Sequence, residues 1–578
     1  MIRSIAAFCI LFFSLQVPAQ DVSLALQKTP KLDAKQRAEK WAHISSEVIA
    51  GFGAGSMRYV LDVPPAGPVK ADWAVSGWKN EKVHTQIVIA SKKALQQLIV
   101  TPGDLKSNNG DIIKKENISV GFVQYVITDE FRNGCGYRKP ENFDSSLVAD
   151  IINTNLSSIA VEKNNTQPVW ISIDIPKDIK AGIYTGSVAV NADKAYRLPI
   201  RLQVLDRNLP DPSGWKFKLD YWQHPAAIAR VHQLALWSDA HFEKMRSYYT
   251  MLANAGQKII TASIVDEPWG HQTYDDYPSL IRWTKKTDGS WSFDYSLFDR
   301  YIAFVMDCGI KSQINCYSMV PWKIAFEYYD EQLKRDTVFT GAIGTAAYDT
   351  FWKTMLVDFT AHLKEKGWFE ITTIAMDERP MKAMQSVIAL LKSVDRNWKI
   401  SLAGAWHPEI EKAIDDYCIA SKWKFPDTTL NDRQRAGKAS TWYVCCTEKY
   451  PNMFSFSPPD ESVWAGWYTA ATGMDGFLRW AYNSWPKAPL KDSRFTAWPA
   501  GDTYQVYPGP LSSIRFEKLI EGIQDFEKIN ILLETYKTNQ QTEKLKALRA
   551  ALATFNIDQL EKKSARQMVE AYKHLLNQ

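Results

Sequence analysis

The feature that most constrains the fold of this 578-residue chain is an alternation that begins after residue 212. Short, apolar, β-rich runs alternate there with longer amphipathic segments such as HFEKMRSYYTMLANAG, whose final Asn-Ala-Gly is typical of a helix C-cap. Eight such strand–helix units in about 270 residues have the number and size of a (β/α)8 barrel. The runs predicted as barrel strands are residues 217–222, 258–265, 312–319, 370–376, 399–405, 416–421, 441–446 and 476–482.

The chain before and after this alternation has different patterns. Residues 21–212 contain runs such as HTQIVIAS and PVWISIDIP, which are separated by Gly, Pro, Asn and Asp clusters and predict an all-β sandwich. The stretch DRNLPDPSG marks a boundary, so the barrel is expected over residues 213–510. Residues 511–578 carry apolar side chains at helical spacing and predict a C-terminal helical extension.

The first 20 residues, MIRSIAAFCILFFSLQVPAQ, have the features of a cleavable secretory signal peptide. One early positive charge, Arg3, precedes an apolar core, and small and polar residues follow around Ala19. Cys9 follows a bulky residue, which disfavours a lipid anchor. No later segment reaches the ~18 uninterrupted apolar residues of a membrane span. The protein is therefore expected to be periplasmic or secreted.

Charge and cysteine content argue against several functional classes. The chain has 69 Lys and Arg residues against 64 Asp and Glu, without a dense basic run, which gives a nucleic-acid role little support. The cysteines after Cys9 are scattered, and their spacing fits neither a disulfide framework nor a metal site. They are expected to be small core residues. For the adjacent pair Cys445-Cys446, packing is likewise favoured over redox chemistry.

Aromatic content gives one positive indication. The chain contains 22 Trp residues, several times the usual frequency, and indole rings stack on the apolar faces of sugar rings. In a secreted protein this excess indicates carbohydrate, although a large core and the seams between domains account for it equally well.

Two acidic doublets, Asp266-Glu267 and Asp377-Glu378, each follow a predicted barrel strand. Active sites of such barrels lie at the carboxyl ends of the strands, so topology places both doublets on the catalytic face. Pro268 favours an extended loop backbone at Glu267, which predicts a wall of the pocket. The apolar strand before Asp377 favours the second doublet as the catalytic pair, because partial burial can separate two carboxyl pKa values. A solvated loop remains the alternative for either doublet.

Five ordered segments then carry a family resemblance: PVWISIDIPKDIKAGIYTGSVAV, TTIAMDERP, DGFLRWAYNSWP, GDTYQVYPG and SIRFEKLIEGIQDFE. Together they resemble glycoside hydrolase family 123, the β-N-acetylgalactosaminidases. The resemblance implies a β-sandwich followed by a barrel, and a retaining mechanism in which the 2-acetamido oxygen of the substrate attacks the anomeric carbon. It implies that Asp377 stays ionised and accepts the acetamide N–H, while Glu378 protonates the leaving oxygen and then activates water. No metal or cofactor is implied.

The resemblance predicts a secreted, exo-acting β-N-acetylgalactosaminidase that hydrolyses terminal β-GalNAc from glycans or glycolipids through an oxazolinium ion. A β-N-acetylhexosaminidase that prefers GlcNAc and a non-catalytic glycan-binding protein on the same scaffold are the alternatives. A rival mechanism uses Glu448, just after the seventh strand, as a covalent nucleophile, but it leaves Asp377 without a role.

Aromatic and polar residues at other strand ends are candidate sugar contacts. Only alternate residues along a strand can face the pocket, so several of them must be packing residues. Arg379 is expected to orient the doublet as an ion-pair partner. The candidates are Trp222, His224, Tyr317, Trp406, His407, Trp480, Tyr482, Asn483, Trp485, Asp502, Tyr504 and Tyr507.

Overall fold

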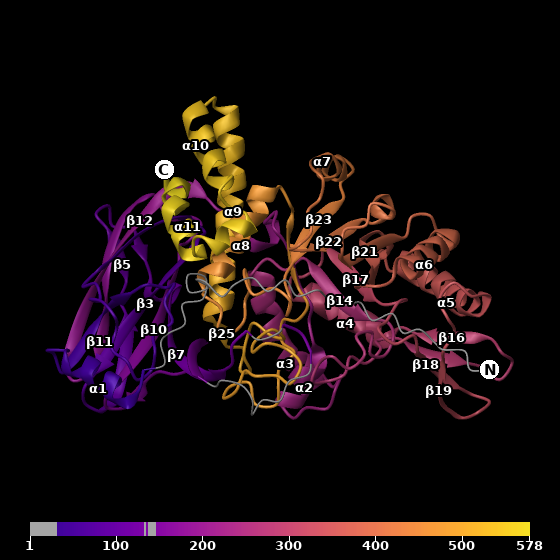
Figure 1. Cartoon of the computed structure of the whole chain (residues 1–578), viewed down its shortest axis with the longest axis horizontal. Coiled ribbons are helices and arrows are strands. Elements are labelled where there is room, and N and C mark those ends of the chain that lie inside the picture. Colours follow the sequence, from indigo (N-terminus) through magenta and orange to yellow (C-terminus); the bar gives the residue numbers. More distant parts are fainter. Residues whose placement is uncertain (1–31, 132–133, 137–145) are drawn as a thin grey trace, which may run out of the picture.

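The computed structural model describes residues 32–131, 134–136 and 146–578. The predicted signal peptide, residues 1–20, lies outside the described residues. None of the helices in the described ranges is long and apolar enough to cross a bilayer. A β-rich N-terminal domain and a barrel lie side by side, and the C-terminal helices rise between them (Figure 1).

The N-terminal domain is a sandwich of two sheets that follows the short helix α1 (Ala34–Ala42). Leu198, Ile200, Leu202 and Val204 are all buried while the residues between them face outward, which is the period of two of a half-buried strand. The first sheet contains β1 (Val48–Gly53), β3 (Lys82–Ser91), β10 (Asn165–Asp174), β7 (Ile118–Thr128) and β8 (Ser146–Asn153), in that order. The second contains β2 (Trp73–Lys79), β12 (Ala195–Asn208), β11 (Gly182–Asn191), β4 (Leu95–Pro102) and β9 (Ile159–Val161), with β5 (Leu105–Ser107) and β6 (Ile112–Ile113) alongside.

Eight parallel strands form the barrel, and each lies within one of the predicted runs or begins within two residues of it. The strands are almost fully buried, because barrel strands are covered on both faces, and most of their residues are apolar. Asp220, Asn315 and Asp416 are buried polar exceptions. A parallel bridge between Leu219 and Gln257 joins the two end strands, so the barrel is nearly closed. The strands are β13 (Lys218–Tyr221), β14 (Ile259–Ser263), β17 (Gln313–Tyr317), β20 (Thr372–Met376), β21 (Lys399–Gly404), β22 (Asp416–Ala420), β23 (Ala439–Tyr443) and β24 (Gly476–Arg479).

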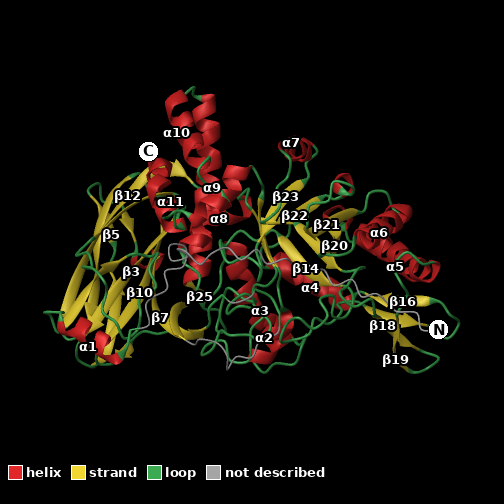
Figure 2. Ribbon diagram, in the orientation of Figure 1, coloured by secondary structure: helices red, strands yellow, loops and turns green. Residues whose placement is uncertain are grey.

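Helices connect these strands except β21 and β22, which are joined through a single 3-10 turn (Glu411–Ala413), so the fifth of the eight predicted strand–helix units lacks its helix. A small sheet extends the loops on one side. The helices are α2 (Pro225–Val231), α3 (Asp239–Asn254), α4 (Ser296–Asp307), α5 (Ala346–Glu365), α6 (Met381–Val394), α7 (Asp427–Arg435) and α8 (Asp460–Thr472). The small sheet, at the right of Figure 2, contains β16 (Trp291–Asp294), β15 (Arg282–Lys285), β18 (Phe326–Asp330) and β19 (Arg335–Phe339). Its aromatic side chains pack on α5, as in the stacked pair Phe339 and Phe351, whose ring centres are 4.4 Å apart.

The C-terminal region begins with a two-residue strand, β25 (Ser512–Ser513), that pairs with β8 of the sandwich and that the sequence does not predict. Helix α9 (Ile514–Thr538) then packs closely along α8, where a Cβ added to Gly466 would lie 1.9 Å from the Gly522 oxygen. The chain ends with α10 (Thr542–Leu552) and α11 (Ala565–Tyr572).

A buried carboxylate joins the sandwich to the parts of the chain that follow the barrel. Asp150, on β8, accepts hydrogen bonds from Arg58 at 3.0 Å, from Nε of Arg515 on α9 at 3.0 Å and from the Tyr507 hydroxyl at 2.6 Å. The side chains of Asp150 and Arg515 are at most 1% exposed. A neighbouring buried pair joins Lys528 on α9 to Glu81. The sandwich is therefore held to α9 by charged groups that are largely out of contact with water.

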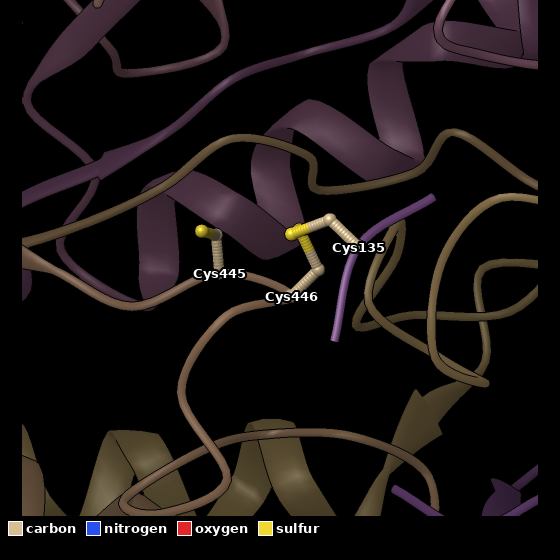
Figure 3. A group of neighbouring side chains, drawn as sticks. All are labelled: Cys135, Cys445 and Cys446. Atoms are coloured by element: carbon tan, nitrogen blue, oxygen red, sulfur yellow. A yellow bond between two sulfur atoms is a disulfide. The ribbon is translucent and has the colours of Figure 1, made fainter. Parts of the chain in front are cut away.

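The cysteines differ in part from the prediction. Cys308, Cys316 and Cys418 are free and buried, as expected of small core residues. Cys135 and Cys446 instead form a disulfide, so the prediction is wrong for these two, while Cys445 next to them is free (Figure 3). The partners are separated by 311 residues, so their spacing carries no sign of the pairing.

Candidate active site

Asp377 and Glu378 follow β20 directly, at the carboxyl end of the barrel. The Asp377 side chain is half-buried and accepts two N–H groups, from Trp322 Nε1 to Oδ2 at 3.0 Å and from the Glu378 backbone to Oδ1 at 2.9 Å. Burial raises the pKa of Asp377 to about 6, against the opposing effects of these two N–H groups and of the Arg379 charge. Asp377 is thus a carboxylate that ionises just below neutral pH.

Glu378 is exposed and is held at one oxygen, Oε1, by the hydroxyl of Tyr443 at the end of β23. Burial and the charge of Glu378 raise the pKa of Tyr443 well above its usual value, so its hydroxyl keeps the proton that it donates. This contact leaves the other carboxyl oxygen of Glu378 available.

Aromatic rings cover the carboxyl end of the barrel beside the doublet. The ring of Trp222 lies 5.0 Å from that of Trp269 and 4.8 Å from that of Tyr317, measured between ring centres. Tyr443 belongs to the same buried cluster, and Trp480 packs against it. The cluster therefore forms an apolar floor next to the two carboxylates.

The doublet Asp266-Glu267 has contacts within its own loop. Asp266 accepts the backbone N–H of Ser279 at 2.9 Å, and Glu267 accepts those of His271 and Tyr277. These bonds shape the loop after β14. Glu267 has a φ of 47°, so the extended backbone predicted there from Pro268 is wrong. Glu267 and His271 lie close enough to Asp276 to hold a cation together, but His271 and Asp276 are exposed.

Some predicted sugar-binding residues lie near the doublet and others do not. Tyr317 and Trp480 belong to the aromatic floor or pack against it. Trp406 and His407 are half-buried on the loop after β21, the strand next to β20. Trp406 packs on Tyr417, whose hydroxyl accepts the His407 backbone N–H.

His224 and Asn483 join the loops after the first and last barrel strands. The Asn483 amide accepts the His224 N–H and donates to the His224 carbonyl, both at 2.9 Å. His224 stacks on Tyr277 with ring centres 3.8 Å apart, and burial lowers its pKa to about 3, so the ring is neutral. Both residues are fully buried and position loops.

The remaining candidates contact the protein interior. Tyr482 donates to the Tyr248 carbonyl of α3, and Trp485 donates to the Val506 carbonyl. Tyr504 is fully buried beside Arg515, and Tyr507 holds Asp150. Asp502 pairs with Arg479 at 2.8 Å and accepts the Trp480 indole N–H at 3.1 Å. It therefore holds Trp480, which packs against the aromatic floor.

Trp322 and Tyr443 hold the doublet although neither is among the predicted site residues. Tyr443 lies within the predicted strand 441–446 and is the last residue of β23, whereas Trp322 lies in a loop without periodicity. Glu448 accepts the Cys445 backbone N–H at 2.9 Å and so contributes to the shape of its own loop.

Comparison with known proteins identifies the family of the chain. Sequence models of the glycoside hydrolase 123 catalytic and N-terminal domains match residues 222–532 and 52–192. A family 123 glycoside hydrolase from Clostridium perfringens, solved in a study of glycolipid glycan hydrolysis, is 28% identical with a TM-score of 0.82 over 92% of this chain and 98% of that one. A xyloglucanase from Bacteroides ovatus is far more distant, at 9% identity and a TM-score of 0.28 over 78% and 98% of the two chains. No curated protein sequence matches. The chain is a glycoside hydrolase and belongs to glycoside hydrolase family 123.

Proposed function

We propose that the protein is a periplasmic or secreted, exo-acting, retaining β-N-acetylgalactosaminidase that removes terminal β-GalNAc from glycans or glycolipids. The observation that carries this proposal is the adjacent pair Asp377 and Glu378 at the end of β20, each held by a different donor. The study of the Clostridium perfringens relative concerns glycolipid glycans, which supports this substrate class. We also propose that the sandwich spans residues 21–212, the barrel 213–510 and the helical extension 511–578.

Asp377 would orient the substrate. A carboxylate has about four acceptor positions, of which Trp322 and the Glu378 backbone take two. A remaining position accepts the acetamide N–H, which directs the acetamide oxygen to the anomeric carbon. Above pH about 6 Asp377 is ionised, and its negative charge offsets the positive charge of the oxazolinium ion.

Glu378 would transfer the protons. Tyr443 donates to Oε1, so a proton on the other oxygen can point to the glycosidic oxygen. As the glycosidic bond breaks, that proton passes to the leaving alcohol and the acetamide oxygen bonds to the anomeric carbon. The resulting carboxylate then takes a proton from the water that opens the oxazoline, and the two displacements together retain the β configuration.

Paired chromogenic β-GalNAc and β-GlcNAc substrates test the proposal. Asp377→Asn and Glu378→Gln are each expected to lower kcat/KM by about 10²–10⁴-fold. Asp206→Asn is the control, because Asp206 is an exposed carboxylate of the sandwich that pairs with Lys79, and it should keep activity near wild type. Wild-type activity in both doublet variants would refute the site. A GlcNAc preference would indicate the β-N-acetylhexosaminidase alternative, and binding without hydrolysis would indicate a glycan-binding protein.

An N-acetyl-sugar thiazoline separates the two mechanisms. This compound mimics the oxazoline and should inhibit only an enzyme whose substrate supplies the nucleophile. Absence of inhibition together with a covalent sugar adduct on Glu448 would replace the proposed mechanism with the rival one.

A further inference from the structure

A tryptophan from another loop holds the carboxylate of Asp377. Trp322 lies five residues after β17, and its indole N–H reaches Asp377 Oδ2 at 3.0 Å. The residue is nevertheless 42% exposed, although large aromatic side chains usually gain from burial. Its position is therefore explained better by the hydrogen bond than by packing.

Two neighbouring loops of the catalytic face hold Trp322 in place. The Trp322 backbone N–H donates to the Pro268 carbonyl at 2.9 Å, which joins it to the loop after β14. A Cβ added to Gly270 in that loop would lie 3.3 Å from the Cβ of Trp322, so the two backbones are closely packed. From the loop after β20, the Arg379 guanidinium lies 5.2 Å from the Trp322 ring centre, within cation–π range.

We propose that Trp322, with Arg379 packed on its ring, is a positioning residue that fixes the orientation of the Asp377 carboxylate and maintains its negative charge. The inference rests on the proposed function, in which Asp377 must be ionised to accept the acetamide N–H. Donors at both of its oxygens fix the plane of the carboxylate, and the remaining acceptor positions then face in a fixed direction. The direct contact of Arg379 is thus with Trp322, while its charge acts on Asp377 through space.

The groups around Asp377 determine how its charge responds to pH. Burial raises its pKa to about 6, the Trp322 and Glu378 N–H groups and the Arg379 charge lower it, and the Glu378 charge raises it. Tyr317 and Tyr443 face it from β17 and β23, but the pKa of each hydroxyl is well above its usual value. Neither tyrosine titrates in the acidic range. Because the proposed function requires an ionised Asp377, we assign the acidic limb of the activity profile to this carboxylate. Removing the Trp322 donor must move that limb to higher pH.

The test is the pH dependence of kcat/KM for Trp322→Phe, with Trp423→Phe as the matched control. Trp423 is a similarly exposed indole, at 39%, on the loop after β22. The acidic limb is expected near pH 6 in the wild type and the control, and about one pH unit higher in Trp322→Phe. Arg379→Met should move it in the same direction, because the charge that favours ionisation is lost.

If the acidic limb lies at the same pH in Trp322→Phe and Arg379→Met as in the wild type, the inference is overturned. This holds even if kcat/KM falls by the same factor at every pH, because such a uniform fall would show only that packing near the site has changed. Asp377→Asn distinguishes this from failure of the proposed function. If Asp377→Asn is inactive and the limb does not move, only the role of Trp322 is wrong. If Asp377→Asn keeps wild-type activity, the proposed function is wrong.

Discussion

Asp150→Asn tests how the sandwich is held to α9. The substitution keeps the shape of the side chain but removes the negative charge that Arg58 and Arg515 share. Both guanidinium groups would then lie out of water without this counter-charge. Removing one partner of a buried ion pair costs about 3–5 kcal/mol, because the other charge is left uncompensated.

The change in melting temperature caused by this loss of stability depends on whether the whole chain or the sandwich alone unfolds in one transition. The entropy of unfolding near 60 °C is about 2.1 cal/mol/K per residue, which gives about 1.2 kcal/mol/K for the 578 residues unfolding as one unit. The melting temperature would then fall by about 3–4 °C. If the sandwich, roughly 180 residues, unfolds first and alone, the same loss lowers its own transition by about 8–13 °C.

Differential scanning calorimetry measures the melting temperature and shows whether the sandwich unfolds separately. Asp206→Asn provides the control. Asp206 is in the same sandwich and pairs with Lys79 at 2.7 Å, but its side chain is 83% exposed. Such a surface pair is worth at most about 1 kcal/mol, so the control should move the transition by no more than about 1 °C in a single-unit unfolding. If Asp150→Asn moves the transition no further than Asp206→Asn, the buried carboxylate does not hold the sandwich to α9 and the reasoning is refuted.

Three other substitutions test the packing of α8 on α9, the hydrogen bond to Glu378 and the disulfide. Gly466→Ala should destabilise the protein by about 1–3 kcal/mol in urea unfolding, because its Cβ would meet the Gly522 carbonyl; an unchanged midpoint would contradict the close packing. Tyr443→Phe should lower kcat/KM by about tenfold, the cost of one hydrogen bond to the Glu378 carboxylate, and unchanged kinetics would show that this bond is dispensable. Cys135→Ser should lower the unfolding free energy by about 2–5 kcal/mol through loss of the disulfide, and equal stability under non-reducing conditions would contradict this.

The barrel could be predicted from the sequence because its strands are covered on both faces. Runs such as KIITASIV must be almost wholly apolar, and they stand out against the amphipathic helices between them. The four-stranded sheet that includes β15 and β16 could not be predicted in this way. Its strands have four or five residues, and the aromatic side chains of β15 and β16, Trp283 and Trp291, pack on Phe351 of α5, which comes much later in the chain.

The same distinction holds for the candidate site. The position of Asp377 and Glu378 follows from strand topology, since residues at the end of a barrel strand lie on the catalytic face. The contacts of residues further along a loop depend on the path of that loop, which local patterns do not determine. For this reason Trp485 was predicted at the sugar but contacts the interior, whereas Trp322 was not predicted and holds Asp377.

The disulfide also constrains the order in which the protein can be made. Cys135 emerges early in synthesis, but its partner Cys446 follows 311 residues later, after seven of the eight barrel strands. Until then Cys135 can meet the thiols of Cys308, Cys316 and Cys418, which are buried only once the barrel has folded. The Cys135–Cys446 disulfide is therefore favoured when the barrel folds before the cysteines are oxidised. If oxidation comes first, full-length chains in which Cys135 is bonded to another cysteine should accumulate.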